Sequence, residues 1–298
     1  MITLEFNATY EPFSREPEYV EVNRQFIESL DLRCEKVILD LACGTGTLTA
    51  IIMEHALKRS RHNIQSRTKC RSPLVLALDI EQEAVRLAHH FIYSTRSEEL
   101  HSVNFVVGSC DDLPLVPGSV DIVIIGNAIQ LFGSLDCVFR EARRVLCANG
   151  RIAFNTAFYA GTFPEGTERF YLRWIQHALN YIRTKAAESG KTGEAAVTRR
   201  RDVSKRAFSH PWLSPDEYKL ALERTGFFPE SFLERRVLLT RHSFETIGSY
   251  AGLASVLLSG YPVRLACRAL EQSAGPAMAD FGVDSIPRLW MEMTARKR

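Results

Sequence analysis

The chain has 298 residues, of which 46% are hydrophobic and 24% charged, and its net charge is +2. This composition is that of an ordinary globular protein, and the near-zero charge gives no general case for binding nucleic acid or a membrane surface. Its seven cysteines are scattered without a C-x-x-C pair. This favours reduced thiols in a cytoplasmic protein over a disulfide framework or a zinc site.

The first 32 residues predict an N-terminal segment that ends in a helix. From Glu18 to Leu30 the apolar residues recur at helical spacing. Two aromatic residues, Tyr10 and Phe13, precede this helix. Residues 1–10 lack the basic head and apolar core of a signal peptide, and the apolar runs of the chain are shorter than the roughly 20 residues of a membrane span.

The stretch 37–48, VILDLACGTGTL, predicts a buried strand, a tight turn and the start of a helix. Asp40 interrupts the apolar run, and Gly44 and Gly46 follow at a spacing of two. Glycines at such a turn allow a ligand to approach the backbone closely. A dinucleotide fingerprint requires a third glycine, at the position of Thr49. Because a carboxylate at this place repels a pyrophosphate and attracts a cation, the stretch favours a positively charged ligand.

Further apolar runs predict a doubly wound parallel sheet, with the ligand outside the carboxyl ends of its strands. The second strand ends at Asp79, whose carboxylate can accept hydrogen bonds from both hydroxyls of a ribose. We expect strands at 74–79, within the unit 103–115, at 120–127 and at 151–156. We further expect a helix at 135–146 that ends at Ala148-Asn149-Gly150, and a basic loop insertion at 58–71. This loop lacks the interleaved aromatic residues of a nucleic-acid surface.

Residues 157–298 depart from this strand–helix alternation. An amphipathic helix carries Trp174, Ile175 and Ala178, and Ser214 with Glu217 forms a capping box at the start of another helix. We expect a sixth strand at 231–240, a helical insertion at 242–279 and a seventh strand at 285–296.

The sequence LDLACGTG, with Asp111 after the third strand and RVLCANGRIAF at 144–154, resembles class I S-adenosylmethionine-dependent methyltransferases, in particular those of quinone biosynthesis. The resemblance implies an α/β fold with a seven-stranded, mostly parallel sheet, in which strand seven runs antiparallel between strands five and six. It further implies an N-terminal lid (1–32), a Rossmann-like cofactor core (33–156), a helical acceptor cap (157–212) and a C-terminal part of the core (213–298).

The resemblance also implies a binding site for S-adenosyl-L-methionine, with S-adenosyl-L-homocysteine as the product. Asp79 would contact the ribose, Cys110 and Asp111 the adenine, and the backbone carbonyl of Asn127 or Ala128 the methionine ammonium group. Gln130 stands where many relatives carry a histidine near the methyl group. The full set of expected contacts comprises Asp40, Ala42, Gly44, Gly46, Asp79, Ile80, Cys110, Asp111, Asn127 and Gln130, with Tyr10 and Phe13 from the lid. Ala42 replaces the first glycine of the family's turn.

The acceptor side of the site is expected in the cap. Glu168 is the first candidate for a catalytic base and His177 the second. The expected acceptor contacts are Phe170, Tyr171, Trp174 and Arg201. A glutamate in the first turn of a helix is also favoured by the helix dipole alone. We expect no metal, because Asp40, Asp79 and Asp111 have no histidine at ligand spacing.

Several functions are compatible with these residues. The partly apolar cap with its arginines favours a small-molecule methyltransferase, for example a C-methyltransferase of a prenyl diphosphate. N- or O-methylation of an amine, a phenol or a carboxylate is the alternative within the same class. A nicotinamide-dependent oxidoreductase and a non-catalytic subunit that binds S-adenosylmethionine are the alternatives from other classes.

Overall fold

The computed structural model describes residues 10–32, 35–62, 73–95, 102–192 and 211–298. The strands are β1 (Val37–Leu41), β2 (Leu74–Asp79), β3 (Val103–Val107), β4 (Val120–Gly126), β5 (Leu146–Thr156), β6 (Phe227–Thr240) and β7 (Ser285–Lys297). The helices are α1 (Glu11–Ser14), α2 (Pro17–Ser29), α3 (Thr47–His62), α4 (Gln82–Thr95), η3 (Ile129–Leu131), α5 (Leu135–Val145), α6 (Glu168–Thr192), α7 (Pro215–Arg224), α8 (Arg241–Gly248), α9 (Ala251–Leu257) and α10 (Val263–Phe281). None of the described helices is both long and apolar enough to cross a membrane.

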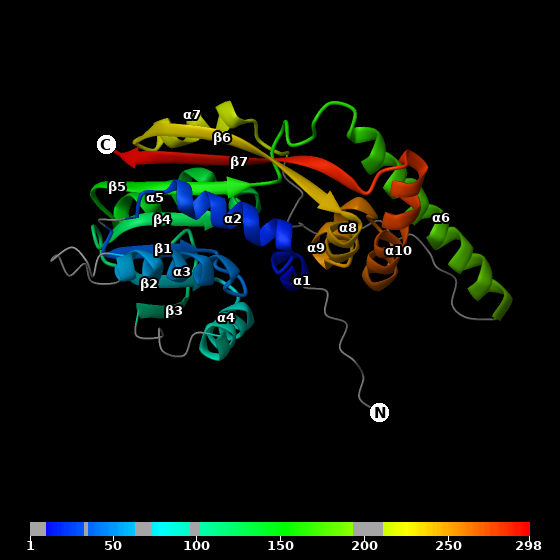
Figure 1. Ribbon diagram of the computed structural model, residues 1–298, viewed down its shortest axis with the longest axis horizontal. Helices are drawn as coiled ribbons and strands as arrows, with labels where there is room; N and C mark the ends of the chain where they lie inside the picture. The colour runs from blue at the N-terminus through cyan, green and yellow to red at the C-terminus, as the bar shows by residue number, and fades with distance from the viewer. Residues whose placement is uncertain (1–9, 33–34, 63–72, 96–101, 193–210) are drawn as a thin grey trace. The chain divides into compact units, whose positions relative to one another are not determined.

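The seven strands form one sheet in the order β3-β2-β1-β4-β5-β7-β6 (Figure 1). Strands β1 to β5 pair in parallel, and β7 pairs antiparallel with β5. The predicted doubly wound sheet is therefore confirmed, including the antiparallel seventh strand between strands five and six. Since β1 and β4 are neighbours and the chain continues from them toward opposite edges, the topological switch point lies between them.

Strand β5 begins five residues earlier than the sequence predicted. Helix α5 ends at Val145, and Leu146 already pairs with Val120, whereas the next pairing joins Arg151 to Ile122. Asn149 adopts the left-handed conformation, with φ 62°. The Asn149-Gly150 pair thus forms an irregularity inside the strand, and the prediction that it ends the preceding helix was wrong.

Alternating side chains of the strands build a hydrophobic layer on each face of the sheet. On one face Ile38, Ile122 and Ala153 join a cluster with residues of α2, α3 and α4. On the other face Phe154 contacts Phe139 of α5 and Tyr218 of α7. Parallel strands covered on both faces explain why β1 and β4 are almost continuously apolar.

The described chain divides into two compact units. The sheet unit comprises Val20–Thr162, Trp212–Arg235 and Trp290–Arg298, and the helical unit comprises Met1–Tyr19, Phe163–Pro211 and Arg236–Leu289. These bounds differ from those of the four predicted segments, because parts of the predicted lid and of the predicted cap fall in each unit. The lid and cap roles stay predictions.

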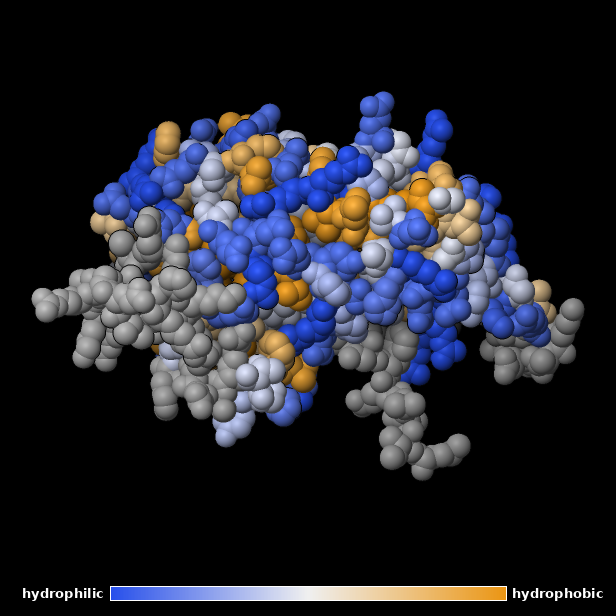
Figure 2. All heavy atoms as spheres, in the orientation of Figure 1, coloured by the Kyte–Doolittle hydropathy of each residue, from blue (hydrophilic) through white to orange (hydrophobic). Residues whose placement is uncertain are grey.

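Hydrophilic residues dominate the face drawn in Figure 2, and hydrophobic residues reach it in patches. Edge strand β6 exposes four large hydrophobic side chains, those of Phe228, Phe232, Leu233 and Leu238. Pro229 and charged residues such as Glu230 and Arg236 interrupt them. Such residues discourage pairing of an edge strand with another chain.

Helix α3 approaches the end of β4 very closely. A Cβ atom on Gly126 would lie 2.5 Å from Cδ2 of Leu48. Leu48 is buried in the core cluster and cannot move aside without displacing its neighbours. The glycine therefore sets the distance between the first turn of α3 and the strand that follows the switch point.

We expect Gly126→Ala to lower the free energy of unfolding by about 1–3 kcal/mol, since it overpacks this contact. Urea titration measures the change. Gly133→Ala is the control, because a Cβ there meets no atom of the described residues within 4 Å. Equal unfolding midpoints for the two variants would contradict the proposed close approach.

Candidate functional site

The turn between β1 and α3 is built from left-handed backbone conformations. Ala42, Gly44 and Gly46 have φ values of 61°, 53° and 87°. The Cys43 amide donates to the Leu78 carbonyl at 3.0 Å, and the Gly46 amide donates to the Cys43 carbonyl at 3.0 Å. Glycine adopts such angles readily, whereas the alanine is strained by about 1–2 kcal/mol. Ala42, which the sequence places at a family glycine, thus keeps the glycine conformation.

Asp40 lies in β1 beneath this turn and is completely buried. Its Oδ2 accepts a 2.6 Å hydrogen bond from the hydroxyl of Thr49, and its Oδ1 has no hydrogen-bond partner among the described residues. Burial raises the pKa of Asp40 to about 7, opposed by the Thr49 hydrogen bond and assisted by the charge of Asp79. An unsatisfied buried acceptor costs about 1–3 kcal/mol. The carboxyl group is therefore suited to a ligand that brings a donor or a positive charge.

Asp79 at the end of β2 accepts hydrogen bonds from the loops that follow β1, β2 and β3. Its Oδ2 accepts from the Gly44 amide at 2.8 Å, its Oδ1 accepts from the Glu81 amide at 3.0 Å, and its backbone carbonyl accepts from the Gly108 amide at 3.0 Å. The side chain is partly exposed, and each carboxylate oxygen can accept a further hydrogen bond. Ile80, which follows it, is 65% exposed and offers an apolar surface beside this acceptor.

The loop after β3 carries the two residues expected at the adenine. Asp111 is exposed, and burial raises the pKa of the Cys110 thiol to about 11. The loop is held from α5, since Glu141 accepts from the Leu113 amide at 2.9 Å and Arg144 donates to the Leu113 and Leu115 carbonyls at 2.8 Å. Glu141 and Arg144 were not predicted as site residues, although their spacing of three on the helix permits their mutual ion pair.

The end of β4 carries a second left-handed turn. Asn127 has φ 50° and is buried. Its backbone N–H donates to both the backbone carbonyl and the side-chain oxygen of Asn155, at 3.0 and 2.9 Å. Gln130 donates to the Asn127 carbonyl at 2.8 Å. Asn127 and Gln130 were predicted from the sequence, whereas Asn155 and its partner Asn23 were not. The polar end of an otherwise apolar strand could have indicated Asn155.

The described acceptor-side residues lie in the helical unit. Trp174 and Phe170 are buried: the Trp174 indole donates to the Leu270 carbonyl at 2.8 Å, and the Phe170 ring centroid lies 4.8 Å from that of Phe244. Both side chains therefore form part of the core of this unit. Glu168 is exposed at the first residue of α6. Arg201 lies outside the described residues.

Two further predicted residues have partners within the helical unit. His177 Nε2 lies 2.8 Å from Oδ2 of Asp280. The Tyr171 ring lies 5.7 Å from the guanidinium of Arg288, and burial raises the pKa of its hydroxyl. His177 is thus held in an ion pair when it is protonated.

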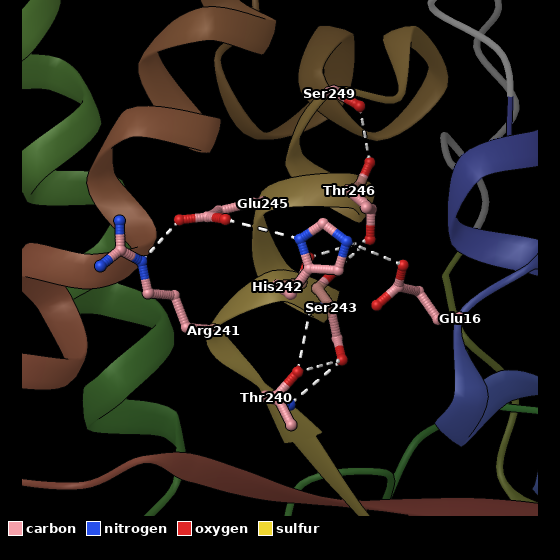
Figure 3. Close-up of polar contacts among 8 residues, drawn as sticks. All are labelled: Glu16, Thr240, Arg241, His242, Ser243, Glu245, Thr246 and Ser249. Atoms are coloured by element: carbon pink, nitrogen blue, oxygen red, sulfur yellow. Dashed lines mark hydrogen bonds and ion pairs between the residues drawn. The ribbon is translucent and has the colours of Figure 1, made fainter.

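The expected lid residues contact the residue that precedes α9 and the start of α2. The Tyr10 ring lies 5.3 Å from that of Tyr250 and 5.4 Å from that of Phe13. Figure 3 shows His242 of α8 between Glu16 and Glu245, at 3.4 and 3.6 Å. Burial raises the pKa of Glu16, and the His242 charge opposes this shift. The segment is thereby fixed within the helical unit by aromatic and charged contacts.

The family described as a methyltransferase domain matches residues 33–186. This span is just over half of the chain and contains every predicted cofactor residue except Tyr10 and Phe13.

Two curated relatives carry names of methyltransferases. A malonyl-[acyl-carrier protein] O-methyltransferase of Marinomonas sp. (strain MWYL1) is 28% identical over 166 residues, 55% of this chain and 54% of the relative. The chain thus spans about half the length of that relative. A ubiquinone/menaquinone biosynthesis C-methyltransferase, UbiE, of Campylobacter jejuni is 24% identical over 205 residues, 68% of this chain and 75% of the relative.

Solved structures support the fold. A Bacillus halodurans protein assigned to the methyltransferases superimposes with a TM-score of 0.54 at 16% identity, covering 93% of this chain and 99% of that one. The [4+2]-cyclase SpnF gives a TM-score of 0.52 at 16% identity, covering 94% of this chain and 81% of that one. One fold thus carries different chemistries, and function has to be argued from the site.

The raised pKa of Asp40 predicts a pH dependence of stability. The carboxyl group titrates near pH 7 when folded and near pH 4 when unfolded. The contribution of the protonated Asp40 carboxyl group to the free energy of unfolding is therefore fully present below about pH 4 and is lost as the pH rises through about 7. We expect the free energy of unfolding to fall by up to about 1.4 kcal/mol per pH unit between these values, and the slope to shrink in Asp40→Asn.

Urea titrations at several pH values between 5 and 8 measure this slope. Asp112→Asn, which changes an exposed acid, is the control and should retain the slope of the unaltered chain. The same slope in Asp40→Asn as in the unaltered chain would refute the assignment to Asp40.

Proposed function

Since the chain belongs to the family of class I S-adenosylmethionine-dependent methyltransferases, we propose that it binds S-adenosyl-L-methionine at the carboxyl ends of β1, β2 and β4. We further propose that it transfers the methyl group to a small, partly apolar molecule. The observation that carries the proposal is the buried Asp40 carboxyl group, whose Oδ1 atom has no hydrogen-bond partner in the part of the chain that the structure describes. In an α/β sheet this place, beside the switch point, is where ligands bind.

The chemistry of the described residues fits this cofactor. Asp40 suits the positive charge of an ammonium or sulfonium group, and the remaining lone pairs of Asp79 suit the two ribose hydroxyls. Ile80 offers an apolar surface for the adenine, next to Cys110 and Asp111. A dinucleotide fits less well, because Thr49 occupies the place of the third glycine and is fixed by its hydrogen bond to Asp40.

When bound, S-adenosyl-L-methionine supplies a methyl group activated by a positively charged sulfur. The protein's own residues then have to orient the acceptor and exclude water, since methyl transfer requires an in-line approach at about 3–3.5 Å. We propose Glu168 as the base, because its carboxylate is exposed at the start of α6. His177, which is paired with Asp280, is the second candidate.

The names of the two relatives bear on the class of acceptor that we propose. Their names describe O-methylation of a malonyl carrier protein and C-methylation in quinone biosynthesis. Neither name describes the methylation of a nucleic acid. As a specific acceptor within this class we propose a prenyl diphosphate. Arg201, the arginine expected to bind its phosphates, lies outside the described residues. The free cysteines among the described residues support a cytoplasmic enzyme.

Calorimetry with the purified chain tests the cofactor assignment. We expect micromolar binding of S-adenosyl-L-methionine and S-adenosyl-L-homocysteine, and we expect Asp79→Ala to weaken both by at least about tenfold. This substitution removes the acceptor for the ribose and for the Gly44 amide.

Asp112→Ala, on the loop after β3, is the matched control and should bind like the unaltered chain. Tight binding of NADH without binding of either adenosyl compound would overturn the proposal. Donor binding without methylation of any acceptor would favour the non-catalytic subunit.

A further inference from the structure

A chain of hydrogen bonds at the carboxyl ends of β4 and β5 fixes the side-chain amide of Gln130. Its Nε2 donates to the Asn127 carbonyl at 2.8 Å, and its Oε1 accepts from the Thr156 hydroxyl at 2.8 Å. The Thr156 oxygen in turn accepts from the Phe158 amide at 2.9 Å. Thr156 is completely buried, whereas Gln130 is partly exposed.

The two possible orientations of this amide are distinguished by its neighbours. The Asn127 carbonyl can only accept, so the nitrogen of Gln130 has to face it. The other end of the amide, Oε1, therefore faces the Thr156 hydroxyl, which donates its single proton to Oε1 and accepts from the Phe158 amide. The network therefore determines which end of the amide is the donor, without any assumption about a ligand.

Asn127 is itself held rigidly. Its amide donates twice to Asn155, and its side-chain Oδ1 accepts from the Ala157 amide at 2.8 Å. These bonds stabilise the left-handed backbone at φ 50°. The carbonyl that receives the Gln130 amide thus occupies a fixed place, and so does the second N–H of that amide, which the bond to Asn127 does not use.

We propose that this second N–H of Gln130 binds an oxygen atom of the methyl acceptor, so that the enzyme selects acceptors that carry a carbonyl, phenol or carboxylate oxygen over amines. The inference rests on the proposed function and narrows its substrate class. Gln130 lies directly after β4, at the end of the sheet where ligands bind. An alkyl ammonium group brings only donors to this place, and the nitrogen lone pair of a neutral aryl amine is delocalised into the ring and accepts a hydrogen bond poorly. Both therefore leave this N–H without a good acceptor.

Thr156 acts in this proposal as a positioning residue through Gln130. Without its hydroxyl, Oε1 loses its donor and the amide can rotate. A purely structural role of the network would change stability in Thr156→Val but would leave the preference between two acceptors unchanged. The preference is therefore the decisive readout, and Thr156→Ser, which keeps the hydroxyl, is the rescue variant.

The experiment compares 4-hexylphenol with 4-hexylaniline, two molecules that differ only in the polar group. Release of S-adenosyl-L-homocysteine gives kcat/KM for each with the full chain. We expect the phenol to be preferred at least about 100-fold. We expect the preference to fall at least about tenfold in Gln130→Met and Thr156→Val and to persist in Thr156→Ser. Because the preference is a ratio of two acceptors measured at the same saturating donor concentration, a change in donor affinity does not alter it.

Several outcomes would overturn the inference: equal turnover of the two acceptors, turnover of the aniline alone, or an unchanged preference in Gln130→Met. Where turnover is slow, saturation-transfer NMR on the complex with S-adenosyl-L-homocysteine measures the same preference as binding, and absence of phenol binding there contradicts it as well. A chain that binds no adenosyl compound would instead refute the proposed function. The two failures are thus distinguishable.

Discussion

A carboxyl group removed from solvent, that of Asp40, is the constraint on which the candidate site depends. One of its oxygens is bonded to Thr49 and the other has no partner among the described residues. Burial without full hydrogen bonding keeps the carboxyl group partly protonated near neutral pH. Its charge therefore becomes favourable when a cation arrives, and the proposed preference for a positively charged adenosyl compound over a dinucleotide follows from this electrostatic situation.

Backbone strain on both sides of the switch point gives the site its second property, rigidity. Ala42 after β1 and Asn127 after β4 are non-glycine residues with positive φ. The hydrogen bonds that Asn127 donates to Asn155 and accepts from Ala157 restrain Asn127, and the bond from Gly44 to Asp79 restrains the first turn. Strained residues of this kind persist only where the surrounding structure fixes them, and they are concentrated at functional sites. The two turns belong to adjacent strands and lie in the same unit.

The sequence predicted the parts of the fold that follow from local pattern. The apolar strands, the glycine turn and the acids at the ends of β1 and β2 were identified because each depends on neighbouring residues. Asn155, Asn23 and Thr156 were missed because their partners are distant in sequence, as the bond from Asn155 to Asn23 illustrates. The early start of β5 was missed because Asn149-Gly150 is equally suited to end a helix or to bend a strand. The burial of Trp174 and Phe170 depends on α8 and α10, whose packing no local pattern reveals.

Proton release on ligand binding tests the role of Asp40 most directly. S-adenosyl-L-homocysteine carries the ammonium group without the reactive methyl group, so binding can be measured by calorimetry near pH 6.5 in two buffers of different ionisation enthalpy. We expect release of about 0.8 proton per ligand bound, since a carboxyl group with a pKa of about 7 has to ionise beside the cation. Asp40→Asn should release none. Identical binding enthalpies in the two buffers, or the same release in the variant, would contradict it.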